Sequence, residues 1–279
     1  MSKRIVIEPE TENGNYWKDI WGFRGLFYFL AWRDILVRYK QTAIGVLWSV
    51  LRPLLTILVM VFIGWLFDSK LPDGVPRVLL VCAATLPWQF FSSSFSEAGN
   101  SLIANSNLLT KVYFPRLIVP ASTVIVCLID FLISFMILII FMMYYQYMPT
   151  IKILALPVFL LLAIITSMGA GLFVAALNVK YRDFKYVIPF IVQFGLYVSP
   201  IAFSSNDIYD SQKIPQLLKT IYSLNPMVGV IDGFRWCILG GETSIYMPGF
   251  VTSILISFFG LFIGVRYFRK MEKSFADII

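Results

Sequence analysis

The sequence has no histidine and few charged residues. The absence of His from all 279 residues removes the commonest side-chain general base and a common ligand of zinc. Cys82, Cys127 and Cys237 are too far apart to predict a disulfide framework or a zinc site. Charged residues make up 14% of the chain, against about 25% in ordinary soluble domains, while hydrophobic residues reach 58%. This balance predicts an integral membrane protein.

Several sequence motifs of enzymes and of secreted proteins are also missing. There is no G-x-x-x-x-G-K-[ST] phosphate-binding loop, so any ATP hydrolysis coupled to this protein requires another chain. There is no Asp-x-Asp pair, which argues against a metal-dependent glycosyltransferase. Residues 1–19 are polar and acidic, unlike a signal peptide, so the first internal span is expected to direct insertion. The net charge of +7 is typical of basic cytoplasmic loops, and we expect no nucleic-acid partner.

Six segments are apolar over about 20 residues, the length that crosses a bilayer as a helix. They predict an all-α protein with six transmembrane helices at about 43–67, 77–97, 117–144, 154–178, 186–204 and 246–266. These spans form a transmembrane domain over 43–268, between cytoplasmic tails at 1–21 and 269–279. With both termini in the cytoplasm, 17 of the 23 Lys and Arg residues lie on the cytoplasmic side. The excess of basic residues therefore predicts this orientation.

Two cytoplasmic segments are amphipathic. Residues 22–41 combine aromatic and aliphatic residues with charged ones, a composition that favours a helix lying in the membrane interface over a plain linker. Residues 98–116 place Leu102, Ile103, Leu108 and Leu109 on one helical face. That face could rest on the membrane or bind a soluble partner, and the pattern alone does not decide between them.

The segment 205–245 is unusually apolar for an external loop. Asn225-Pro226 divides it into two pieces that are each too short to span. Such pieces are typical of re-entrant helices, which are tolerated where protein or a cavity surrounds them. We therefore predict two short re-entrant helices before the last span, in preference to a folded external cap.

Two of the charged residues inside the predicted spans are candidates for a role in transport. Asp130 lies near the middle of its span, where a carboxylate requires a partner, water or a proton. It is consistent with a proton relay, which would suit a proton-coupled secondary transporter, or with a structural hydrogen bond between helices. Arg52 lies near the cytoplasmic end of the first span. It could face a cytoplasmic opening and bind a diphosphate, or extend along the helix to a lipid phosphate as an anchor.

Aromatic residues are the remaining candidates to line a transport path. Most aromatic side chains near the ends of spans belong to the interfacial belt of membrane proteins, but an inward-facing ring can stack on a sugar ring. The residues assigned to this role, besides Arg52 and Asp130, are Trp88, Phe90, Phe91, Tyr197, Phe203 and Trp236.

Four blocks of sequence resemble a known family. VRYKQTAIGVLWSVLRPLL (37–55), PWQFFSSSFSEAGNSLIANSNLLTKVYFPRLIVP (87–120), ALNVKYRDFKYVIP (176–189) and LNPMVGVIDGFRWCILG (224–240) are similar to the polysaccharide-export permeases of the ABC-2 type. The similarity extends in register over about residues 20–270. The tract from Pro87 to Pro120 is most similar to the O-antigen branch. Arg52 departs from the pattern, in which a neutral polar residue such as Gln is expected.

This resemblance implies a homodimer bound to two copies of a cytoplasmic ABC ATPase in the bacterial inner membrane. It implies a lipid-linked polysaccharide as substrate, carried on undecaprenyl diphosphate and moved through a channel at the dimer interface, with capsule or teichoic-acid export as alternatives. ATP and magnesium would bind the ATPase, and this chain would carry no cofactor. The residues implied to couple to the ATPase are Arg33, Arg38, Asn105, Asn107, Leu108, Leu109 and Lys111, with Arg182 and Asp183 as a second, smaller contact.

Overall fold

A computed structural model describes residues 16–40, 45–66, 71, 74–181, 183–240 and 245–275. Within these residues the protein is helical and has no strand. The first half comprises α1 (Tyr16–Gly22), α2 (Arg24–Lys40), α3 (Gly45–Leu66), α4 (Arg77–Ala104), α5 (Ser106–Lys111) and α6 (Ile118–Tyr144). The second half comprises a 3-10 turn η1 (Ile151–Ala155), α7 (Leu156–Lys180), α8 (Phe184–Val198), α9 (Ser205–Tyr209), α10 (Gln216–Ser223), α11 (Pro226–Ile238) and α12 (Met247–Glu272).

Five of the described helices are long and apolar enough to cross a membrane. They are α3, α4, α6, α7 together with η1, and α12, and they agree with five of the six predicted spans. The predicted span at 186–204 corresponds to α8, which ends earlier, at Val198. Ser199 is extended because it precedes Pro200, which disfavours the helical conformation. The 15 residues of α8 extend only about 22 Å, so the sixth crossing stays a prediction.

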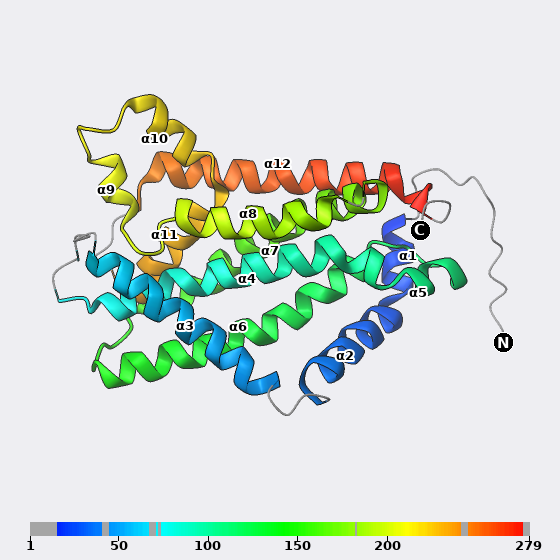
Figure 1. Ribbon diagram of the computed structural model, residues 1–279, viewed down its shortest axis with the longest axis horizontal. Helices are drawn as coiled ribbons and strands as arrows, with labels where there is room; N and C mark the ends of the chain where they lie inside the picture. The colour runs from blue at the N-terminus through cyan, green and yellow to red at the C-terminus, as the bar shows by residue number, and fades with distance from the viewer. Residues whose placement is uncertain are drawn as a thin grey trace.

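Helix α4 forms the centre of the bundle and contacts α3, α6, α7, α8 and α11. It begins after Pro76 and continues to Ala104, beyond the predicted end at residue 97. Near its start, the six residues from Leu79 to Ala84 are almost completely inaccessible to solvent. Figure 1 shows the long helices packed side by side around it. Because α4 is surrounded on most sides, its polar residues are held at fixed positions inside the protein.

Helices α7 and α12 approach each other closely through glycine. A Cβ atom added at Gly264 would lie 2.2 Å from the carbonyl oxygen of Gly169. A Cβ added at Gly169 would lie 2.6 Å from the backbone of Leu261. Small residues permit this backbone contact, which is how helices associate where water provides no hydrophobic driving force. The pair α7–α12 therefore forms a closely packed side of the bundle.

The two ends of the bundle carry different elements. Helices α1, α2 and α5 lie at one end with the last turns of α12, whereas α9, α10 and α11 lie at the opposite end (Figure 1). At the first end, the Tyr16 hydroxyl donates to the Glu272 carboxylate at 2.8 Å, and the backbone N–H of Arg116 donates to the same carboxylate at 2.7 Å. These bonds join α1, the start of α6 and the end of α12.

The interfacial segment predicted at 22–41 is helical, and α1 precedes it within residues assigned to the tail. In α2, Leu30 is buried, while Tyr28, Phe29 and Trp32 are exposed. One part of the apolar surface of α2 therefore packs against the protein, and another part faces outward. This division suits a helix at a membrane surface, and the location in the interface stays a prediction.

The apolar segment before the last span forms two helices, α10 and α11, divided at Asn225-Pro226 as predicted. The side chain of Asn225 caps α11 by accepting a hydrogen bond from Met227 N–H at 3.0 Å. Helix α11 is buried against α4, α7 and α12. Arg235 within it is only 1% exposed. Its guanidinium donates to the carbonyl oxygens of Leu80, Ile201 and Phe203 at 3.3, 3.0 and 2.8 Å. These hydrogen bonds join α11 to α4 and to the segment between α8 and α9.

Candidate functional site

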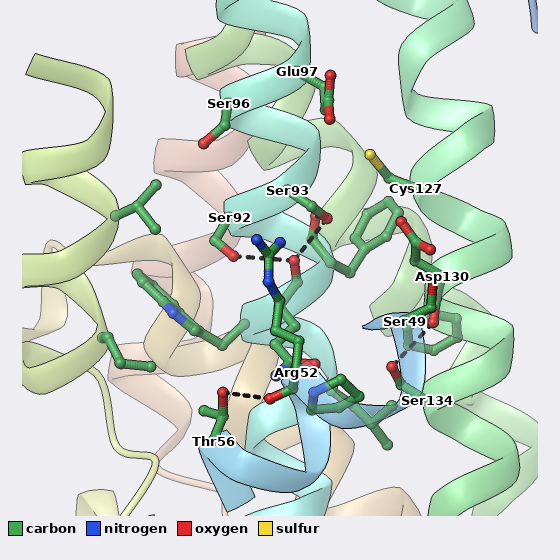
Figure 2. A pocket seen from close by; sticks show the side chains of 18 of the residues that line it. Ser49, Arg52, Thr56, Ser92, Ser93, Ser96, Glu97, Cys127, Asp130 and Ser134 are labelled. Carbon is green, nitrogen blue, oxygen red and sulfur yellow. Dashed lines mark hydrogen bonds between the residues drawn. The ribbon is translucent and has the colours of Figure 1, made fainter. Parts of the chain in front are cut away.

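An open pocket of about 920 Å³ lies between α3, α4, α6 and α8, with one residue of α2 at its wall. Figure 2 shows the polar side chains that α3, α4 and α6 present to it. Most of its polar lining consists of hydroxyl and amide groups, from Ser49, Thr56, Gln89, Ser92, Ser93, Ser96, Asn100, Ser134 and Gln193. Neutral groups of this kind can both donate and accept hydrogen bonds. The pocket therefore suits a ligand rich in hydroxyl groups.

The polar stripe on α4 explains why the pocket exists. Gln89, Ser92, Ser93 and Ser96 recur at spacings of three and four residues, which places them on one helical face. The hydroxyls of Ser92 and Ser93 donate to the carbonyl oxygen of Gln89 at 3.1 and 2.8 Å. These bonds satisfy the hydroxyl hydrogens within the helix and leave oxygen lone pairs facing the pocket.

A cluster of charged residues joins three helices at the wall of the pocket. Arg38 on α2 places Nη1 2.6 Å from Asp130 Oδ2 on α6, and its other terminal nitrogen pairs with Glu97 on α4. The Tyr39 hydroxyl donates to the second oxygen of Asp130. The side chains of Arg38 and Asp130 are 29% and 28% exposed, whereas that of Glu97 is 46% exposed. This charge cluster fixes the C-terminal end of α2 to the transmembrane helices.

The charge cluster gives Asp130 a structural partner. The sequence left open whether Asp130 is a proton relay or a structural contact, and its partners in the fold are a guanidinium and a phenol. Burial raises the pKa of Tyr39, and the hydrogen bond to Asp130 raises it further, so Tyr39 remains a protonated donor. The arrangement favours the structural interpretation of Asp130.

Arg52 on α3 is exposed and lines the same pocket. Its side chain extends from α3 into the pocket, in the direction of Ser92 and Ser93 on α4 (Figure 2). Of the two orientations considered from the sequence, the observed one faces the opening between helices.

The predicted aromatic candidates do not gather at one place. Trp88 and Phe90 line the pocket, and Trp88 packs so closely on α8 that a Cβ at Gly195 would lie 2.5 Å from its ring. Phe91 stacks on Phe95 inside the bundle. The other three lie outside the lining residues of the pocket: Tyr197, Phe203 and Trp236.

The predicted coupling residues are partly brought together at the α2–α5 end. Arg33 on α2 donates to the side-chain oxygen of Asn105, between α4 and α5, at 2.8 Å. On α5, Asn107 and Lys111 are exposed and Leu108 is partly buried. Leu109 is 4% exposed and belongs to an apolar cluster with Leu30, so it holds α5 in place.

The remaining coupling candidates lie elsewhere. Asp183 is exposed and immediately precedes α8, and Arg182 lies outside the described residues. Arg38 belongs to the charge cluster beside the pocket. Contact of any of these residues with an ATPase stays a prediction.

Some residues of the site were missing from the sequence-based candidates. They are Tyr39 and Glu97 of the charge cluster and the neutral polar residues of the pocket. The stripe of Gln and Ser inside an otherwise apolar span was the available signal for the pocket. No such signal existed for Tyr39, because its partner is 91 residues away in the sequence.

Comparison with known proteins identifies related sequences. The model of the ABC-2 type transporter family matches residues 25–239. The chain is 28% identical over 255 residues to the O-antigen export system permease protein RfbA of Klebsiella pneumoniae, covering 88% of this chain and 92% of that protein. It is 27% identical over 219 residues to the protein of the same name from Myxococcus xanthus, covering 78% and 82%. It is 25% identical over 250 residues to the polysialic acid transport protein KpsM of Escherichia coli, covering 87% and 92%.

Proposed function

Because the chain belongs to the ABC-2 type transporter family, we propose that it is the membrane permease subunit of an ATP-driven polysaccharide exporter. Its relatives from Klebsiella pneumoniae and Myxococcus xanthus are named as O-antigen permeases, and O-antigen is the substrate class that we assign. The observation that carries the proposal is the pocket lined by hydroxyl and amide groups within an apolar bundle, because such groups suit a polyhydroxylated chain. The similarity to a polysialic acid transport protein supports capsule export as the second candidate.

The substrate that we propose is a polysaccharide attached to a polyprenyl diphosphate lipid such as undecaprenyl diphosphate. A pocket that lies between helices α3 and α8 can receive a glycan while the lipid remains in the bilayer. The outer faces of both helices carry exposed apolar residues, including Phe62 and Phe190, which are compatible with a lipid chain or with another protein subunit. We assign this protein to the bacterial inner membrane, with six crossings including α8 and both termini in the cytoplasm.

We further propose that two copies of the chain form the transport channel. The pocket of one chain holds only about 920 Å³, and six helices are few to enclose a polymer. A two-fold homodimer, the commonest form of soluble oligomer, would close two such pockets around one passage. Introducing a cysteine at Tyr197, which is exposed on α8, into a chain whose Cys82, Cys127 and Cys237 are replaced by serine tests this arrangement. Cross-linking between two copies in membranes is the expected result, and a strictly monomeric permease would contradict it.

Two copies of a separate ABC ATPase would drive transport from the α2–α5 end. The exposed side chains of Asn107 and Lys111 on α5, and the link from Arg33 to Asn105, support this location. A movement of α5 would be transmitted to α2 through this link and then to the pocket through the charge cluster. ATP and magnesium would bind only the ATPase.

The central experiment combines genetics and purification. Deleting the gene should abolish the surface polysaccharide of the host cell and leave lipid-linked polymer on the cytoplasmic side. The purified chain should also form a stable complex with an ATPase encoded nearby. A control strain should carry an ATPase inactivated in its phosphate-binding loop, which preserves the complex but stops export. A deletion strain that still exports its surface glycan would refute the proposal.

A further inference from the structure

The pocket contains one cation that no acidic side chain neutralises directly. Arg52 lies seven residues after the start of α3, about 10 Å along the helix axis, in a helix that has no other charged residue. Within the described part of the chain, its guanidinium forms no ion pair and no hydrogen bond. A charged side chain at this depth requires water, a lipid headgroup or an anionic ligand. Its direction into the pocket distinguishes it from a side chain that follows the outer surface of the helix (Figure 2).

The two carboxylates of the pocket are already occupied. Glu97 and Asp130 both pair with Arg38, and Asp130 also accepts a hydrogen bond from Tyr39. The four charged residues that line the pocket sum to zero, but three of them form the charge cluster with a formal charge of −1. The remaining charge of +1 is on Arg52. The pocket is therefore polarised, and an anionic group is attracted to the Arg52 side and repelled from the cluster.

A second unpartnered donor lines the same pocket. The side-chain nitrogen of Gln89 is buried and has no hydrogen-bond partner among the described residues. An unsatisfied buried donor costs about 1–3 kcal/mol, so its retention calls for a partner outside the protein. Gln89 is on α4, one turn before Ser92 and Ser93, toward which Arg52 extends. Both unpartnered groups donate hydrogen bonds, and their common partner must be an acceptor.

We propose that Arg52 and Gln89 bind the phosphate group of the lipid-linked substrate, with the glycan directed toward the charge cluster. A guanidinium forms bidentate hydrogen bonds with phosphate, and an amide adds a neutral donor. Sugar hydroxyls can donate to the free lone pairs of Glu97, which is the most exposed member of the cluster. This inference rests on the proposed function and specifies which residues recognise the anionic part of the substrate.

The experiment measures binding to the complete permease–ATPase complex in nanodiscs of neutral phosphatidylcholine. The probes are polyprenyl diphosphate, the uncharged polyprenol and phosphatidylglycerol. Arg52→Gln should weaken polyprenyl diphosphate binding about ten- to a hundredfold, since a charged hydrogen bond is lost, and should not change polyprenol binding. Arg52→Lys keeps the charge but not the bidentate geometry and should be intermediate.

The matched control is Arg266→Gln on α12, an exposed arginine that does not line the pocket. It should alter diphosphate binding less than about twofold, because only headgroup contacts would be lost. Equal losses of polyprenyl diphosphate and phosphatidylglycerol in Arg52→Gln would identify a lipid anchor and overturn the inference. Unchanged binding in both Arg52 variants, or no binding by the wild type, would also overturn it. None of these three results bears on the proposed function, which fails if the deletion strain still exports.

Discussion

Breaking the contact between Arg38 and Asp130 should destabilise the protein through the junction of α2 and α6. The change is Asp130→Asn, which keeps the shape of the side chain and removes its charge. Loss of one partner costs about 3–5 kcal/mol in a fully buried ion pair and about 0–1 kcal/mol in an exposed one. Both side chains are slightly under 30% exposed, and we expect about 2 kcal/mol. Glu97→Gln should cost less, because Glu97 is 46% exposed.

The assay is thermal unfolding of the purified protein in nanodiscs, combined with a double-mutant cycle. For a chain of this length, about 2 kcal/mol corresponds to a decrease of roughly 3 to 4 °C in melting temperature. Arg38→Gln and Asp130→Asn should be non-additive, with a coupling energy of about 1–2 kcal/mol, since each removes the same contact. Arg24→Gln, on an exposed position of α2, serves as the control and should leave the melting temperature unchanged.

Two results would refute this reasoning. Additive effects of the Arg38 and Asp130 substitutions would mean that the pair does not contribute as a unit. A fully stable Asp130→Asn protein that no longer transports would instead indicate a proton relay at Asp130. The structural role predicts the opposite pattern, in which loss of stability accompanies any loss of export.

Three further predictions concern other parts of the bundle. Arg235→Met should lower the free energy of unfolding by more than about 3 kcal/mol, because three carbonyl groups lose a charged donor. Little folded protein should then appear in size-exclusion chromatography, and a normal yield would contradict this. Gly264→Ala should destabilise by about 1–3 kcal/mol in thermal unfolding, whereas Gly260→Ala, with open space around its Cβ, should be neutral or slightly stabilising. Lys111 is exposed, so Lys111→Glu should weaken pull-down of the ATPase without changing the melting temperature. Leu109 is buried, so Leu109→Asp should lower the melting temperature. The reverse pattern would mean that the ATPase binds elsewhere.

The helices of the membrane domain could be predicted from local sequence. Apolar runs of about 20 residues are sufficient to define spanning helices, and five of the described helices agree with that expectation. The break between α10 and α11 was also predictable, because Pro226 cannot continue a preceding helix. The predicted span at 186–204 is longer than α8. Apolar residues continue past Ser199, but the helical conformation ends at Val198.

The partners of individual polar residues depended on the tertiary structure. Arg38 and Asp130 are 92 residues apart in the sequence, and nothing near either one indicates the other. Arg235 lies in the segment 205–245, and only the fold shows that its guanidinium is buried against carbonyl groups of two other segments. Composition and periodicity determine that a segment is an apolar helix, because that depends on neighbouring residues. Which polar groups meet inside the bundle depends on how the helices pack, and only the fold could show that Arg52 faces the pocket.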